Sequence, residues 1–205
     1  MNGNPVSGGN GLVSRAKAMV LTPKTEWPIV EAEPSTVAEI YKSYVIWLAA
    51  IGPICSVIGQ LVFGLPFVGV MFAISPSFII ASAIVSYVLG LVGVYVMALI
   101  INWLAPQFGG GSNMVQAFKA AAYSWTAAWL AGVFGIIPAL AILGIVGLYS
   151  LYVLYLGLPV LMKVPQDKAV TYTVVSIVAC IVIYWIIMTI AGTITMRLWM
   201  PTVVI

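Results

Sequence analysis

The chain alternates between long apolar stretches without charge and short polar segments that hold the charged residues. Three stretches contain no Asp, Glu, Lys or Arg, namely residues 43–118, 120–162 and 169–196. A helix needs about 20 apolar residues to cross the roughly 30 Å of bilayer hydrocarbon. The pattern therefore predicts five membrane-spanning helices, over residues 44–61, 78–104, 114–134, 139–162 and 169–195.

Composition agrees with a membrane protein. Of the 205 residues, 63% are apolar and 6% are charged, and the mean hydropathy is +1.15. Soluble domains carry about 25% charged residues. The predicted fold is all-α and polytopic: a bundle of five transmembrane helices preceded by an N-terminal amphipathic interfacial helix. We divide the chain into a cytoplasmic N-terminal segment, residues 1–35, and a five-helix transmembrane domain, residues 36–205.

The N-terminal segment combines an amphipathic pattern with a proline-rich stretch. Apolar residues from Leu12 to Val20 follow helical spacing, whereas Arg15 and Lys17 take the other side. Two placements fit this short basic helix: the membrane surface, with its cations facing anionic headgroups, or the cytoplasmic face of the protein itself. Residues 22–35 contain three X-Pro steps, which favour an extended, irregular segment. Within it, Trp27 is predicted to be an interfacial anchor.

Short motifs predict how the helices begin and pack. Thr36 and Glu39 form a capping-box pattern before the first span, and Ser112 or Asn113 caps the third. Gly and Pro in residues 61–77 predict a hairpin or a partly re-entrant loop. The glycine loop before the third span favours a simple turn, with an anion site as the alternative. The third span also offers a small-residue surface that lets another helix approach closely, made by Ala127, Ala128, Ala131 and Gly132.

The distribution of basic residues predicts the orientation. With five spans and a cytoplasmic N-terminus, seven Lys and Arg lie on the inner side and one, Arg197, on the outer side. The inner seven are Arg15, Lys17, Lys24, Lys42, Lys119, Lys163 and Lys168. If residues 61–77 formed a further span, the split would fall to five against three. The positive-inside rule therefore favours five spans with the N-terminus in the cytoplasm and the C-terminus outside.

The titratable residues exclude most catalytic and metal chemistry. The chain has no histidine and five acids in all, so general acid–base catalysis and histidine ligation of a metal or haem are largely excluded. Four of the acids gather near the N-terminus and form either a solvated loop or a hard-cation site; they are Glu26, Glu31, Glu33 and Glu39. Cys55 and Cys180 fall inside apolar spans, where we expect them to pack. We expect no enzymatic activity, cofactor or bound metal, and no nucleic-acid partner.

Uncharged polar residues inside the spans, together with tyrosines, supply a candidate cavity. The polar residues are Ser56, Gln60, Ser86, Asn102, Ser124, Thr126 and Ser150. Most residues of this kind form hydrogen bonds between helices. Tyr149, Tyr152 and Tyr155 share one broad helix face, because three residues fall short of a full turn of about 3.6. These tyrosines either pack against neighbouring helices or line a cleft. The candidate intramembrane cavity consists of the three tyrosines with Gln60 and Asn102.

Five segments also carry a family resemblance. They are residues 15–27 (RAKAMVLTPKTEW), 31–34 (EAEP), 105–109 (APQFG), 122–129 (AYSWTAAW) and 152–168, which ends in GLPVLMKVPQDK. As a set they resemble bacterial members of the Yip family, named for Ypt/Rab-GTPase-interacting proteins. The resemblance covers nearly the whole chain and implies five membrane helices with a cytoplasmic N-terminus, in agreement with the charge count. Eukaryotic members of this family are linked to Rab GTPases and vesicle traffic.

Two functional hypotheses follow. The leading one is a non-enzymatic protein of the bacterial cytoplasmic (inner) membrane that organises the membrane or binds partners, whether lipids, other proteins or further copies of itself. Its candidate cytoplasmic surface for a partner or for lipid consists of Arg15, Lys17, Trp27, Lys163 and Lys168. The alternative is a passive channel or a transporter of lipids or small molecules that uses the candidate cavity. An ion-coupled carrier is disfavoured, because no span holds a charged residue near its middle.

Overall fold

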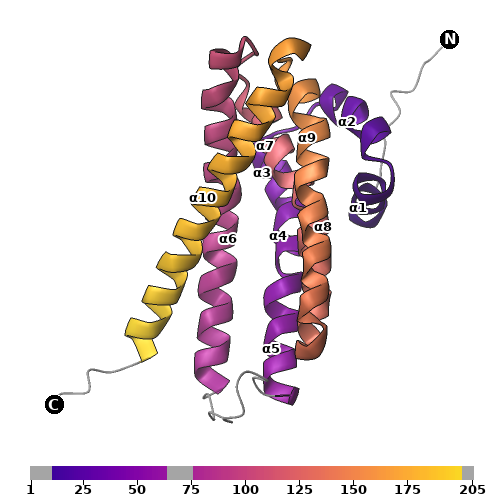
Figure 1. Ribbon diagram of the computed structural model, residues 1–205. Coiled ribbons are helices and arrows are strands. Elements are labelled where there is room, and N and C mark those ends of the chain that lie inside the picture. The colour runs from indigo at the N-terminus through magenta and orange to yellow at the C-terminus, as the bar shows by residue number, and fades with distance from the viewer. Residues whose placement is uncertain (1–10, 64–75, 200–205) are drawn as a thin grey trace.

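The computed structural model of the protein describes residues 11–63 and 76–199, and every regular element within them is helical (Figure 1). In chain order the elements are α1 (Leu12–Leu21), α2 (Pro23–Ala32), α3 (Val37–Ile40), the π-helix η1 (Tyr41–Val45), α4 (Ile46–Ala49), α5 (Ile51–Phe63), α6 (Pro76–Leu104), the 3₁₀ helix η2 (Ala105–Phe108), α7 (Met114–Ser124), α8 (Thr126–Ala131), the 3₁₀ helices η3 (Gly132–Ile136) and η4 (Pro138–Leu148), α9 (Tyr149–Met162) and α10 (Gln166–Trp199). The prediction of an all-α protein is confirmed.

Four helices in the described part of the chain are long and apolar enough to cross a membrane. They cover Val37–Phe63, Pro76–Phe108, Ile142–Met162 and Gln166–Ile194, with mean hydropathies between 1.9 and 2.7. The predicted third span is divided at Trp125 into α7 and α8, so the count of five is not confirmed. The predicted re-entrant segment, residues 61–77, lies mostly outside the described residues.

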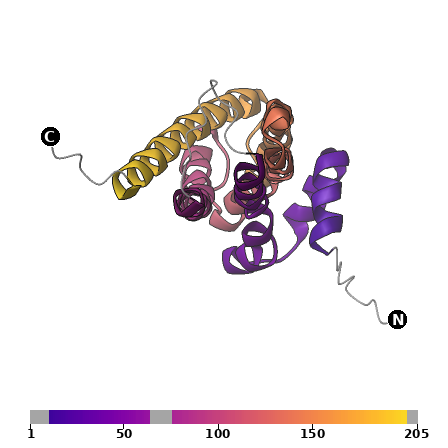
Figure 2. The same ribbon diagram turned by 90° about the horizontal axis from the view of Figure 1, so that it is seen from below.

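The long helices stand side by side as a bundle, with α1 and α2 on one flank and α10 on the opposite flank (Figure 2). In Figure 1, α10 crosses α6 obliquely and its C-terminal end leaves the bundle. Within the bundle, α10 packs on α6, α7 packs on α6 and α9, and η3 packs on α5. The chain reverses at Ile137, whose extended backbone separates η3 from η4. This reversal brings η4 back along α8 and η3.

Small residues bring the helix backbones of the bundle close together. A Cβ placed on Gly132 would lie 2.6 Å from the Cα of Gly52 in α5, so a larger side chain at this crossing would force the backbones apart. Gly147 approaches α8 in the same way, because a Cβ there would lie 3.2 Å from the Cα of Ala128 and 3.7 Å from the Cβ of Ala131. The small-residue packing surface predicted for the third span is therefore confirmed.

Two predicted helix starts are also confirmed. The Thr36 hydroxyl accepts from the backbone N–H of Glu39 at 3.2 Å, and the Glu39 carboxylate accepts from the backbone N–H of Thr36 at 2.8 Å. Asn113 caps α7, because its side-chain oxygen accepts from the two backbone N–H groups of Val115 and Gln116. Both arrangements satisfy amide groups that have no partner inside the helix.

The prediction of an irregular segment over residues 22–35 is wrong. Most of this segment is helix α2, which Pro23 begins at a position where a missing N–H costs nothing. The restriction on residues before proline holds at Thr22 and Glu33, both outside the helical region, and these residues bound α2. It fails at Trp27, which is helical before Pro28 and whose side chain is buried against α9.

Candidate functional site

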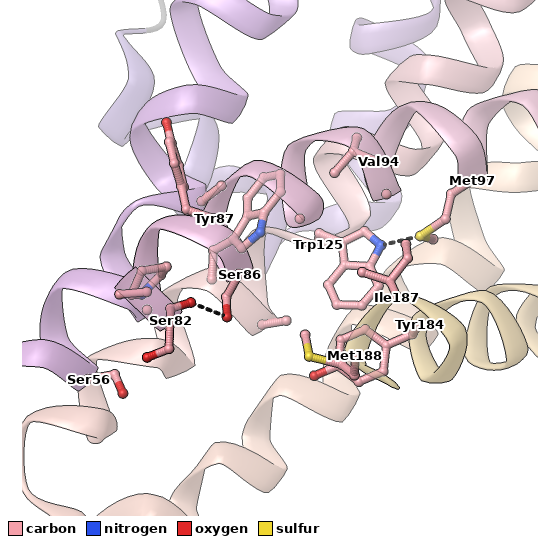
Figure 3. A pocket seen from close by; sticks show the side chains of 18 of the residues that line it. Ser56, Ser82, Ser86, Tyr87, Val94, Met97, Trp125, Tyr184, Ile187 and Met188 are labelled. Carbon is pink, nitrogen blue, oxygen red and sulfur yellow. Dashed lines mark hydrogen bonds between the residues drawn. The ribbon is translucent and has the colours of Figure 1, made fainter. Parts of the chain in front are cut away.

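The centre of the bundle contains a cavity of about 580 Å³ between α5, α6, α8 and α10, here called the first cavity (Figure 3). Its walls are mainly apolar, and none of the lining residues is charged. On the α10 side, the lining residues Tyr184 and Met188 are 44% and 40% exposed. The first cavity is therefore accessible from the flank of the bundle that a bilayer would surround.

The hydroxyl groups that line the first cavity are mostly satisfied by the protein itself. Those of Ser82, Ser86 and Tyr87 each donate to a backbone carbonyl of α4 or α6 at 2.7–2.9 Å. Gln60 donates from Nε2 to the Ser56 hydroxyl at 2.8 Å. Because most of these hydrogens are already used, the walls offer few free donors to water or to an anion, and their mainly apolar surface suits hydrocarbon better.

A second cavity of about 570 Å³ adjoins the first and lies between α8, η4, α9 and α10. Both cavities are lined by Gly52, Met97, Trp125, Ala128 and Tyr184. The Trp125 and Tyr184 rings lie with their centroids 5.9 Å apart. Trp125 donates its indole N–H to the Met97 sulfur at 3.2 Å, as Figure 3 shows. The two cavities thus meet at a wall of two aromatic rings that carries a polar N–H.

The residues predicted to form an intramembrane cavity do not come together. Gln60 lines the first cavity, but Asn102 instead accepts a hydrogen bond from Ser112 near the glycine loop. None of the three tyrosines lines either cavity, and Tyr152 and Tyr155 are 42% and 43% exposed. The reason is the orientation of α9, whose opposite face packs into the bundle.

Sequence reasoning missed most of the first cavity, although a signal for it exists in α6. Small or hydroxyl-bearing residues recur there at spacings of three and four, which places them on one face of the helix. They are Ser82, Ser86, Gly90 and Gly93, and Met97 continues the same face. Within this set only Ser86 was among the polar residues identified from the sequence, and the periodic stripe was not recognised.

On the flank of the bundle opposite α10 (Figure 2), α1 and α2 (residues 12–32) form what we call the N-terminal cap. Trp27 holds the cap to α9: its side chain is fully buried and its indole N–H donates to the Val153 carbonyl at 3.0 Å. The ring lies directly on Gly157, where any Cβ would overlap it. Trp27 is therefore a packing residue in a glycine notch and not the exposed interfacial anchor that was predicted.

A group of paired charges holds the cap together. Arg15 donates to the carboxylates of Glu26 and Glu33, and Arg15 and Glu26 are both almost fully buried. Burial lowers the pKa of the Arg15 guanidinium, but its hydrogen bond to Glu33 and the charges of Glu33 and Glu26 outweigh burial and raise the pKa above its ordinary value. Arg15 thus stays charged as an internal cation, and not on the polar face of α1 where the pattern placed it.

Helix α7 holds the C-terminal end of α2. Lys119 is 2% exposed, and its ammonium donates to the carbonyls of Val30 and Glu33 at 2.7 and 2.6 Å. Gln116, one turn earlier, donates to the Glu31 carbonyl at 3.0 Å. Carbonyls at a helix C-terminus have no partner within the helix, and a cation there also interacts favourably with the helix dipole. The cap is therefore fixed to the bundle at both α7 and α9.

The candidate cytoplasmic surface is split by the fold. Arg15 and Trp27 are buried inside the cap, whereas Lys17, Lys163 and Lys168 are exposed. Lys163 reaches Glu31 at 3.2 Å, so part of its charge is used within the protein. The exposed part of the candidate surface is thus three lysines, with one of them paired.

Neither alternative role of the glycine loop and the acidic residues is supported. The amides of Gly110 and Gly111 donate to the carbonyls of Ala105 and Met162, each at 2.9 Å, so the loop is a turn with its amides in use. In the described part of the chain, no group of three or more His, Cys, Asp or Glu is placed to hold a metal ion. The glutamates are instead partners of basic groups and of a helix start.

Comparison with known proteins agrees with the helical membrane fold. The family model for the Yip1 domain matches residues 17–189. Two relatives are the proteins named Inner membrane protein YohC of Escherichia coli strains K12 and O6:H1, each 29% identical over 117 residues. That alignment covers 57% of this chain and 60% of each relative's length. No solved structure matches the chain. Because the family match extends from α1 through the bundle into α10, the chain belongs to the Yip1 domain family.

Proposed function

We propose that the protein is a non-enzymatic membrane protein that organises the bilayer around it by holding lipid hydrocarbon in the first cavity. The observation that carries this proposal is the cavity of about 580 Å³, with walls that are mainly apolar and without charge and with partly exposed residues on its α10 side. Its size is within the range of about 300–1,000 Å³ typical of small-molecule sites.

The chemistry of the walls favours lipid over the alternative of a passive channel. A pore for ions or water needs carbonyl oxygens, charges or hydroxyls facing its lumen. In the first cavity, the hydroxyls of Ser82, Ser86 and Tyr87 donate to the backbone, and the walls are mainly carbon. A lipid transporter would use the same cavity. Binding of lipid in the first cavity is therefore required both for a membrane-organising role and for lipid transport.

We further propose that the chain crosses the bacterial inner membrane five times, with the N-terminus in the cytoplasm and the C-terminus outside. The path of the backbone supports this topology: α7, α8 and η3 pack between neighbours and lead from the end near the cap to the end where α5 finishes (Figure 1). The basic residues Arg15, Lys119 and Lys163 gather with the cap, as expected for a cytoplasmic end. The name of the relatives places those proteins in the inner membrane.

The lipid proposal is tested by filling the first cavity. A Cβ at Gly90 meets no atom within 4 Å, so Gly90→Leu places a side chain in the cavity without a clash at its root. Gly192→Leu is the matched control, because Gly192 also lies in a long helix with open space around it but lines neither cavity. We expect native mass spectrometry of the purified full chain to detect bound lipid in the wild type and in the control, and to detect much less in Gly90→Leu.

Recovery of the wild type without lipid in several membrane extracts would contradict the proposal. Equal lipid retention by Gly90→Leu would do the same.

The topology is tested with single cysteines at Gln166 and Arg197 in a Cys55→Ala, Cys180→Ala background. A membrane-impermeant thiol reagent added to intact cells should label position 197, and position 166 should react after the cells are opened. Labelling of position 166 from outside would overturn the proposed orientation.

A further inference from the structure

The two cavities adjoin each other at a shared aromatic wall. Each has a volume of about 570–580 Å³. Five of the residues that line them are common to both: one each from α5, α6, α8 and α10, and Trp125 between α7 and α8. Trp125 and Tyr184 stand at that junction, with their ring centroids 5.9 Å apart. A ligand that occupied both cavities would therefore need a branch point beside these rings and an apolar arm on each side.

The junction also holds a hydrogen-bond donor with a weak partner. Trp125 donates its indole N–H to the Met97 thioether sulfur, and this kind of sulfur is a poor acceptor. A carbonyl oxygen of a ligand would be a better acceptor for the same N–H. Because no lining residue of either cavity is charged, the polar group of the ligand at this point must be neutral.

We propose that the two cavities together bind one two-chain lipid, with one hydrocarbon chain in each cavity and an ester carbonyl at the junction accepting a hydrogen bond from Trp125. The proposal rests on the proposed function, and it deepens that function by naming the ligand class. The charged headgroup of such a lipid remains outside the uncharged walls. A single-chain lipid would leave one cavity empty and so lose part of the buried apolar area.

The first test compares chain number in the wild-type full chain. The probes are a diester phosphatidylglycerol with two palmitoyl chains, its single-chain lyso form, and a diether analogue without carbonyl groups. We expect native mass spectrometry titration to show one diester lipid per protein, bound at least about tenfold more tightly than the lyso form. The diether analogue should bind about 2- to 10-fold more weakly than the diester, because it lacks the carbonyl acceptor. Equal affinity for the diester and lyso lipids would overturn the proposal.

The second test fills one cavity at a time. Gly144 lines the second cavity and a Cβ there meets no atom within 4 Å, so Gly144→Leu is the counterpart of Gly90→Leu. Each variant should lower diester affinity to the level of the lyso form while leaving lyso affinity nearly unchanged, and the double variant should bind neither. An unchanged diester affinity in Gly144→Leu would show that the second cavity is not used, and it would overturn the two-chain assignment.

Trp125→Phe tests the hydrogen bond itself. This variant keeps an aromatic ring and loses the N–H, so it should bind diester and diether lipids with equal affinity while retaining its preference for two chains. A persistent preference for the diester would overturn the role of Trp125. The outcomes also separate the two proposals: if the wild type binds none of the three probes the proposed function fails, whereas lipid binding that is indifferent to chain number removes this inference alone.

Discussion

The N-terminal cap and the two cavities treat polar groups in opposite ways. In the cap, Arg15 and Trp27 are buried, and Lys119 of α7 is buried against the cap; all three donate hydrogen bonds to carboxylate or carbonyl oxygens. At the cavities, Trp125 has a sulfur atom as its acceptor and the walls are otherwise mainly carbon. A buried charge is tolerated when its partners are complete, whereas a void is tolerated when something else fills it. We therefore interpret the cap as a structural part of the molecule, in contrast to the cavities, which we propose bind lipid.

The largest effects are expected in the cap, and the first prediction concerns its paired charges. Arg15→Met removes the cation and leaves the Glu26 carboxylate, which is 5% exposed, without its partner. We expect the free energy of unfolding to fall by about 3–5 kcal/mol, because an uncompensated buried charge is costly. Unfolding in mixed SDS micelles measures this loss. Lys17→Met on the same helix is the control and should change stability by less than about 0.5 kcal/mol, since Lys17 is exposed.

A second prediction concerns the contact of Trp27 with Gly157. Trp27→Ala should destabilise the protein by about 3–5 kcal/mol through loss of a fully buried indole. Gly157→Ala should cost about 1–3 kcal/mol, because the new Cβ overlaps that ring. In the Trp27→Ala background the cost of Gly157→Ala should largely disappear, because the two changes act on one contact. If the two losses are additive in the double-mutant cycle, the cost of Gly157→Ala does not come from overlap with the Trp27 ring.

A substitution that fills the first cavity should not lower the free energy of unfolding, in contrast to the substitutions in the cap. Gly90→Ala adds one methyl group to open space in the middle of α6, and alanine favours helix by up to about 1 kcal/mol over glycine. We expect the free energy of unfolding to stay equal or to rise by up to that amount, measured in the same micelles without added lipid. A loss of more than about 1 kcal/mol would indicate that the site is packed, as in the cap.

The smallest effect is expected at the three tyrosines of α9, Tyr149, Tyr152 and Tyr155. Tyr152 is 42% exposed and lines neither cavity, so Tyr152→Ala should change the free energy of unfolding by less than about 0.5 kcal/mol. It should also leave the amount of bound lipid unchanged in native mass spectrometry. A clear loss of bound lipid would place the binding site on the outer face of α9 and reverse the comparison between cap and cavity.

Features that depend on neighbouring residues were predictable from the sequence. The capping box of Thr36 and Glu39 and the cap at Asn113 each involve residues at most three positions apart. The apolar stretches likewise predict helices, because a helix satisfies its own backbone hydrogen bonds in an apolar medium. The small-residue surface that includes Gly132 was predictable, because small residues are themselves the signal for close helix packing. The sequence did not predict that Gly52 is the residue packed against it.

Features that depend on distant partners were not predictable. The helical pattern placed Arg15 on an outward polar face, but its partners Glu26 and Glu33 lie 11 and 18 residues away and make an inward position favourable. A tryptophan beside a membrane span is typical of an interfacial anchor, but Trp27 is buried and its indole N–H donates to a carbonyl 126 residues away. Segments 15–27, 31–34 and 152–168, which carry the family resemblance, contact one another in the folded protein. A comparison of sequences alone does not show these contacts.

The amino-acid sequence by itself determined the class of the molecule, because apolar runs of this length have one stable environment and one way to satisfy their backbone. It also determined the asymmetry of charge on which the proposed orientation rests. The tertiary structure alone decided which polar residues are internal and which face outward, since that choice depends on partners from other helices. It also decided where the cavities lie. A cavity is the space that several helices fail to fill together, and no single segment carries that information.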